Sequence, residues 1–159
     1  MNLGLLLLRL VLAVLLAGHA MQKLRGWFGG AGLGGTGEIF ARWGFVRGRR
    51  MAFVAGLAEL TGAASIGTGL LTAGGCAVVT GTMAVATVAT APNGFWAQKG
   101  GCEVPFWYGA VAVVLGFTGP GAWSLDAVAR LALSGYVWGG GALALGLLAA
   151  MVPLTLRSR

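Results

Sequence analysis

Four stretches of apolar residues, each about long enough to cross a lipid bilayer, dominate the sequence. A helix needs about 20 mostly apolar residues to span the hydrocarbon core, where the backbone must satisfy its own hydrogen bonds. Only 9% of the 159 residues are charged, whereas a soluble domain carries about a quarter. We therefore expect an all-α integral membrane protein.

Breaks between the apolar stretches set the expected limits of the spanning helices. A tight turn is expected at residues 72–75, and Pro92-Asn93-Gly94 and Gly119-Pro120-Gly121 are typical helix stops. The third and fourth stretches are short, so they must extend into their flanks or thin the bilayer. The expected spans are residues 3–19 or somewhat beyond, 52–71, 76–91 and 104–118, with a fifth at 136–156.

The first apolar stretch also has one feature of a secretory signal peptide. Ala17-Gly18-His19-Ala20 resembles a small-residue cleavage site. However, no basic residue precedes the apolar run, and Arg9 interrupts it. We therefore expect a retained helix.

The positive charges predict how the spans are oriented. Cytoplasmic loops of membrane proteins carry an excess of Lys and Arg. With five spans, only Arg130 lies on the sparse side and Arg9 lies within the membrane, which places the N-terminus outside and the C-terminus in the cytoplasm of a prokaryotic cell. With four spans, the last two basic residues change sides and the bias weakens. The residues of the rich side are Lys23, Arg25, Arg42, Arg47, Arg49, Arg50, Lys99, Arg157 and Arg159.

The net charge of +7 does not indicate nucleic-acid binding. The basic residues cluster between hydrophobic segments and at the C-terminus, and they form no stripe along an exposed helix. Contact with anionic lipid head groups explains this placement better. Membrane lipids are therefore expected partners, and nucleic acid is not.

The segment between the first two spans, residues 25–51, is expected to lie at the membrane interface. Thr36 is positioned to cap a short helix over residues 38–43, with Glu38 and Arg42 toward water. The preceding residues 30–35 match a G-x-G-x-x-G pattern, but no strand precedes them, so a flexible hinge is preferred. The expected interfacial anchors are the aromatic residues Trp27, Phe28, Trp43 and Phe45.

Ionisable residues inside the spans form a predicted polar seam. Arg9, His19 and Lys23 fall within a sector of about 80° on one helix. Glu59 is the only acid of the second span and lies between the depths of Arg9 and His19, so either is its expected partner. Such groups indicate a functional site by default. Two interpretations stay open: an ion pair that fixes helix register, or a polar pocket or proton path.

The cysteines and the single histidine exclude several kinds of site. Cys76 and Cys102 form no C-x-x-C pair and are expected on opposite sides of the membrane, so no disulfide joins them. One histidine and two separated cysteines fall short of a usual metal ligand set. Bis-histidine haem ligation within this chain is excluded, because His19 is its only histidine.

Several short motifs, in order, make the chain similar to the DoxX family. The resemblance departs at Ala20, where the family usually has glycine, and it covers about residues 5–127. The motifs are Leu8-Arg9-Leu10, His19-Ala20-Met21-Gln22-Lys23-Leu24, Gly26-Trp27-Phe28-Gly29-Gly30, Gly56-Leu57-Ala58-Glu59-Leu60-Thr61-Gly62, Pro92-Asn93-Gly94-Phe95, Gly101-Cys102-Glu103-Val104-Pro105 and Gly119-Pro120-Gly121-Ala122-Trp123-Ser124-Leu125-Asp126.

The resemblance implies an antiparallel four-helix transmembrane bundle over residues 1–127. Residues 128–159 would then add a fifth C-terminal transmembrane helix and a basic tail. If the resemblance carries over, the seam residues Arg9, His19, Lys23 and Glu59 line the bundle. Asn93, Glu103 and Asp126 would sit at the bundle ends, with Asp126 opposite the other two, so these residues cannot all form one compact site.

The resemblance also implies a function. Relatives are associated with thiosulfate:quinone oxidoreductase and with membrane-bound thiol or oxidative-stress complexes. The first hypothesis is therefore an anchor or accessory subunit of a quinone-linked or other membrane redox complex, with other subunits as partners. The chain has no self-contained catalytic or redox motif, so haem or flavin is expected only in partner subunits, although a quinone fits. The alternatives are a binder or transporter of a small lipophilic molecule, and a purely structural accessory subunit.

Overall fold

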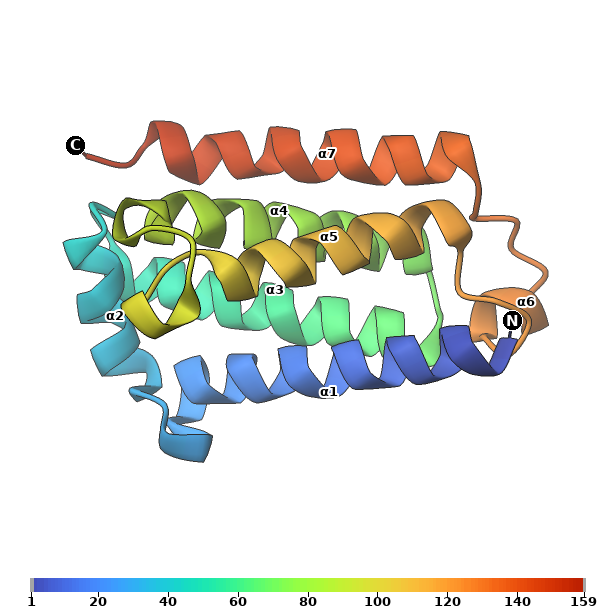
Figure 1. Ribbon diagram of the computed structural model, residues 1–159, viewed down its shortest axis with the longest axis horizontal. Helices are drawn as coiled ribbons and strands as arrows, with labels where there is room; N and C mark the ends of the chain where they lie inside the picture. The colour runs from blue at the N-terminus through green and yellow to red at the C-terminus, as the bar shows by residue number, and fades with distance from the viewer. Residues whose placement is uncertain (1, 159) are drawn as a thin grey trace.

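The computed structural model describes residues 2–158, and within them the fold is all helical. Figure 1 shows the long helices lying side by side, with α2 across one end of the bundle and α6 at the other. We refer to these as the α2 end and the α6 end. The lengthwise helices are α1 (Asn2–Arg25), α3 (Gly48–Thr68), α4 (Thr72–Thr90), α5 (Glu103–Thr118) and α7 (Tyr136–Thr155). The short elements are η1 (Trp27–Gly29), α2 (Gly32–Arg42), η2 (Ala91–Asn93), η3 (Ala97–Lys99) and α6 (Leu125–Val128).

Length and composition of these helices confirm an all-α integral membrane protein. Four helical segments, α1, α3, α4 extended to Asn93, and α7, are long and apolar enough to cross a membrane, and α5 is a shorter apolar helix. Their outer faces carry exposed large apolar side chains such as Val14, Leu145 and Leu148. A soluble monomer rarely exposes a continuous apolar surface of this extent, so this surface contacts lipid.

The turn between α3 and α4 differs from the sequence prediction. The turn lies at residues 69–71, where Gly69 and Leu71 have φ angles of 67° and 51°, and residues 72–75 instead form the first turn of α4. The carboxylate of Asp126 accepts hydrogen bonds from the backbone N–H groups of Leu71 and Thr72, at 2.7 and 2.9 Å. A carboxylate at the N-terminus of a helix satisfies its free donors, and this one comes from a segment 55 residues away.

The expected helix between the first two spans is present but begins earlier than predicted. α2 starts at Gly32, and Thr36 is buried inside the helix, so the prediction that Thr36 caps it is wrong. The glycine-rich residues 30–35 are largely helical, which also corrects the hinge prediction. Gly37 allows α2 to pack closely against the start of α3, because a Cβ there would come within 2.8 Å of the Arg49 backbone.

The aromatic residues of this segment divide into two groups. Trp27 and Phe28 are exposed, as interfacial anchors would be, whereas Phe45 is only 4% exposed, so its prediction as an anchor is wrong. Phe45 packs with Phe40 in a small core that includes Ala89 of α4. This core closes the α2 end of the bundle.

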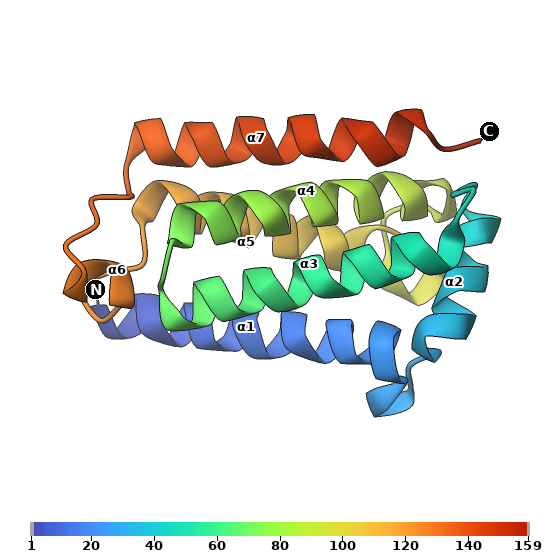
Figure 2. The ribbon, with the colours of Figure 1, turned by 180° about the vertical axis from the view of Figure 1, so that it is seen from behind.

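The C-terminal helix belongs to the same bundle. α7 packs against α4, where a Cβ on Gly146 would come within 2.7 Å of the Ala77 carbonyl oxygen. The tail then returns to the segment after α2: Ser158 donates its N–H to the Gly44 carbonyl at 2.9 Å, and Arg157 donates to the Trp43 carbonyl. Figure 2 shows α7 running the full length of the bundle, with the C-terminus at the α2 end.

Candidate functional site

A cavity of about 590 Å³ occupies the half of the bundle nearest the α2 end. Side chains from α1, α2, α3, α4, α5 and α7 line it, and almost all of them are apolar. Typical small-molecule pockets measure about 300–1,000 Å³ and are mostly apolar with a few placed polar groups. The cavity therefore has the size and character of a ligand site.

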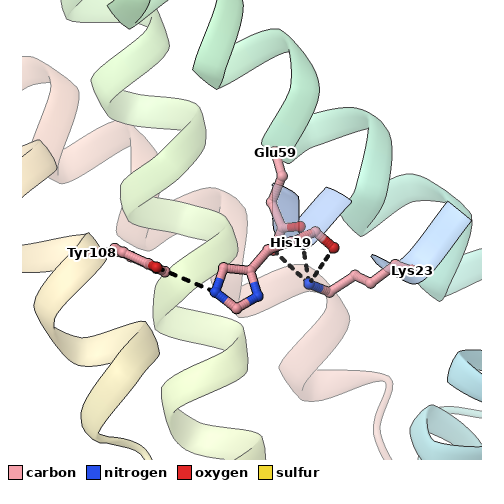
Figure 3. A network of polar contacts seen from close by, with 4 residues as sticks. All are labelled: His19, Lys23, Glu59 and Tyr108. Atoms are coloured by element: carbon pink, nitrogen blue, oxygen red, sulfur yellow. Dashed lines mark hydrogen bonds and ion pairs between the residues drawn. The ribbon is translucent and has the colours of Figure 1, made fainter. Parts of the chain in front are cut away.

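An ion pair between α1 and α3 forms one polar part of the wall. Lys23 Nζ lies 3.0 and 2.9 Å from the two carboxylate oxygens of Glu59. The side chain of Glu59 is 4% exposed and that of Lys23 is 22% exposed. Lys23 Nζ also donates to the backbone carbonyl of His19 at 3.4 Å. The buried carboxylate is therefore fully engaged by one lysine (Figure 3).

A second polar pair joins α1 to α5. His19 Nε2 and the hydroxyl of Tyr108 are 3.2 Å apart, and the rings meet edge to face with centroids 5.4 Å apart. Which group donates depends on the imidazole tautomer. Figure 3 shows the pair beside Lys23 and Glu59, so these four residues form one polar cluster on the cavity wall. We call them the polar cluster.

The structure brings together three of the four predicted seam residues, but with a different pairing. The partner of Glu59 is Lys23, so the expectation that Arg9 or His19 pairs with it is wrong. Helical side chains tilt toward the N-terminus of their helix, and a lysine side chain is long. Lys23 can therefore reach back to the depth of Glu59 from one turn beyond His19.

Arg9 belongs to a separate buried site at the α6 end. Its Nη2 donates to the Trp123 carbonyl at 2.5 Å, while Nε and Nη1 have no hydrogen-bond partner among residues 2–158. Its guanidinium contacts Gly69, in the turn that Asp126 holds. Arg9 of α1 thus contacts both the turn between α3 and α4 and the segment that contains Trp123.

The other predicted bundle-end residues form local hydrogen bonds. Asn93 Nδ2 donates to the Gly100 carbonyl at 3.1 Å, and Glu103 Oε2 accepts from the Ala97 N–H at 2.9 Å. These two lie at the α2 end and Asp126 lies at the α6 end, so the three do not meet. Any functional role for them stays a prediction.

The cysteines are both free thiols. Cys76 is buried among core residues of α4, whereas Cys102 precedes α5 at the other end. Among residues 2–158, no three His, Cys, Asp or Glu side chains gather in a way that would hold a metal ion.

Tyr108 is the residue of the polar cluster that sequence reasoning missed. It lies inside the predicted span 104–118, whereas the other tyrosine, Tyr136, is the first residue of a predicted span, and this position could have marked Tyr108. A tyrosine hydroxyl in an apolar environment usually finds a hydrogen-bond partner.

Part of the cavity wall is also lipid-facing surface. Val54, Val78 and Val152 line the cavity and are 57%, 39% and 61% exposed. They belong to α3, α4 and α7, three of the membrane-spanning helices. The cavity therefore opens in part toward the outer surface of the bundle.

Comparison with known families identifies a match. The family model described as DoxX matches residues 4–92, which is more than half of the 159-residue chain. No curated protein and no solved structure matches.

Proposed function

The chain belongs to the DoxX family, and from that premise we propose that this membrane protein binds a small lipophilic molecule in the cavity at the α2 end. The observation that carries the proposal is the single polar cluster, His19, Lys23, Glu59 and Tyr108, on the wall of an otherwise apolar cavity. Apolar walls favour a lipophile, and a few placed polar groups fix its orientation.

The charge balance of the cluster indicates a neutral ligand. Glu59 already neutralises Lys23 through both carboxylate oxygens. A charged ligand would bring a further charge into a low-dielectric site, which costs several kcal/mol unless that charge is paired. A neutral molecule with a hydrogen-bonding group that reaches His19 or Tyr108 fits better.

A quinone meets these requirements, and this links the cavity to the redox hypothesis. Quinones carry two carbonyl acceptors on an apolar ring. Because His19 and Tyr108 are hydrogen-bonded to each other, either the Tyr108 hydroxyl or the other imidazole N–H of His19 is free to donate to one of these carbonyls, depending on the tautomer. The sequence has no self-contained redox motif. A quinone function would therefore place it as a subunit beside a partner protein that carries flavin or haem.

A direct binding measurement tests the proposal. Decylubiquinone is titrated into the purified protein in mild detergent, and quenching of tryptophan fluorescence is followed, because Trp43 lines the cavity. Tyr108→Phe removes only the hydroxyl and is expected to weaken binding about five- to tenfold, as the loss of one net hydrogen bond predicts. The matched control is Tyr136→Phe, because Tyr136 is 90% exposed and lies at the α6 end.

Two outcomes contradict this proposal. Absence of saturable quenching by decylubiquinone, together with no enriched lipophile in an extract of the purified protein, removes the binding function. Equal affinities of Tyr108→Phe, Tyr136→Phe and wild type place the ligand elsewhere.

The redox-subunit hypothesis has its own test. The tagged chain is extracted gently from native membranes, and co-purifying proteins are identified by mass spectrometry alongside an absorbance spectrum. A stoichiometric oxidoreductase partner with a flavin or haem signal is the expected result. In such a complex, a purely structural role predicts that Glu59→Gln lowers assembly but leaves the turnover of each assembled complex unchanged.

A further inference from the structure

A second hollow lies on the surface where α3 begins. It measures about 810 Å³ and includes Leu33 of α2, the arginines Arg47, Arg49 and Arg50, and the apolar residues Phe53 and Val54. All three arginines are exposed. We call Arg47, Arg49 and Arg50 the arginine notch.

None of the three arginines forms an ion pair in the part of the chain that the structure describes. Of the four acidic residues, Glu59 pairs with Lys23, Glu103 accepts from Ala97 and Asp126 is at the opposite end. The fourth, Glu38, forms no ion pair among residues 2–158. Three arginines therefore line one hollow without an ion-pair partner among residues 2–158.

The depth of the arginine notch matches the boundary between water and lipid. Its arginines stand at the start of a membrane-spanning helix, and Phe53 and Val54 follow one turn deeper. These two residues are 46% and 57% exposed. The hollow thus combines a cationic part at the membrane surface with an apolar part in the hydrocarbon, which is the pattern of a phospholipid.

We propose that the arginine notch binds the phosphate head group of an anionic phospholipid, with an acyl chain along Phe53 and Val54. Guanidinium groups pair with phosphate oxygens through parallel hydrogen bonds, and basic residues next to a spanning helix attract anionic lipids. Val54 also lines the cavity at the α2 end, so the bound lipid would lie beside that cavity's rim. The proposal does not depend on what the cavity binds.

Retention of lipid by the purified protein tests this site. Wild type is reconstituted with equal amounts of phosphatidylglycerol and phosphatidylcholine, and the lipid that stays bound is measured by native mass spectrometry. Wild type is expected to retain phosphatidylglycerol preferentially. The variant Arg47→Gln/Arg49→Gln/Arg50→Gln is expected to lose that preference by about tenfold or more, since the loss of a single charge-assisted hydrogen bond to phosphate weakens binding by about that factor.

The chain offers a control with the same change of charge. Arg25→Gln/Arg42→Gln/Lys99→Gln removes three exposed basic side chains at the same end, and none of them lines the hollow. This control is expected to keep the preference for phosphatidylglycerol. Equal losses in both triple variants would show general electrostatic attraction and overturn a defined site. Displacement of the lipid by glycerol 3-phosphate, which lacks acyl chains, would overturn the proposed acyl-chain contact with Phe53 and Val54. Thermal unfolding of each variant in detergent confirms that it is folded.

Discussion

At the residue scale, the two members of the Lys23–Glu59 ion pair differ in how deeply they are buried. The carboxylate is almost completely buried, whereas the ammonium group keeps some contact with its surroundings. Taking an ionised carboxylate into a low-dielectric interior costs several kcal/mol. Loss of the partner is therefore expected to cost more free energy for the buried Glu59 carboxylate than for the Lys23 ammonium group.

This asymmetry leads to a prediction for single and double variants. Lys23→Leu is expected to lower the free energy of unfolding by about 3 kcal/mol, because it leaves the buried carboxylate without its partner. Lys23→Leu/Glu59→Leu is expected to be milder than either single change. The measurement is reversible unfolding in mixed micelles by titration with an ionic detergent.

Arg9 provides a control for the single and double variants of Lys23 and Glu59. It lies fourteen residues before Lys23 on α1, which is about 21 Å along the helix. The effects of Arg9→Leu and Glu59→Leu should therefore add to within about 0.5 kcal/mol. Strong coupling between Arg9 and Glu59, with additivity between Lys23 and Glu59, would contradict the pairing in the structure.

At the element scale, the α4–α7 contact depends on two glycines. A Cβ on Gly81 would lie 2.8 Å from the Gly146 carbonyl oxygen, and a Cβ on Gly146 would lie 3.1 Å from the Gly81 N–H nitrogen. Membrane helices gain little from the hydrophobic effect against one another, so close backbone approach through small residues supports their association. The sequence shows several glycines around α7 but not which of them face α4.

Two alanine substitutions on α7 test whether a glycine that faces α4 differs from one that does not. Gly146→Ala is expected to destabilise the protein by about 1–3 kcal/mol, because the new methyl group meets backbone atoms of α4. Gly140→Ala has open space within 4 Å and is expected to be neutral or stabilising, by up to about 1 kcal/mol of helix propensity. Thermal unfolding in detergent distinguishes them, and equal effects of the two changes would refute the contact.

At the scale of the whole molecule, the basic residues gather at one end of the bundle. The α2 end holds eight of the eleven lysines and arginines, namely Lys23, Arg25, Arg42, Arg47, Arg49, Arg50, Lys99 and Arg157. Because α7 runs lengthwise, the C-terminus lies at this same end (Figure 1). The positive-inside rule then predicts that the α2 end and its cavity face the cytoplasm.

Cysteine labelling of intact cells tests this orientation. In a Cys76→Ala/Cys102→Ala background, Ala129→Cys is expected to react with a membrane-impermeant maleimide from outside, because Ala129 is exposed near the α6 end. Lys99→Cys, exposed at the α2 end, is expected to react only after the membrane is permeabilised. The reverse labelling pattern would show that the α2 end faces the outside of the cell.

The sequence alone determined the properties that depend on local composition and period. The apolar stretches predicted the four helices that are long enough to cross a membrane, whereas the predicted span 104–118 is the shorter apolar helix α5. The helical period placed His19 and Lys23 on one face. The same reasoning placed Asn93 and Glu103 at one end of the bundle and Asp126 at the other.

Only the tertiary structure decided which of these groups meet. The pairing of Lys23 with Glu59, the role of Asp126 at the start of α4 and the burial of Phe45 all join segments far apart in the chain. They depend on how each helix is rotated and shifted against its neighbours, which hydrophobic period and length do not specify. The cavity depends on the same relations, because six helices contribute to its wall and no single one encloses it.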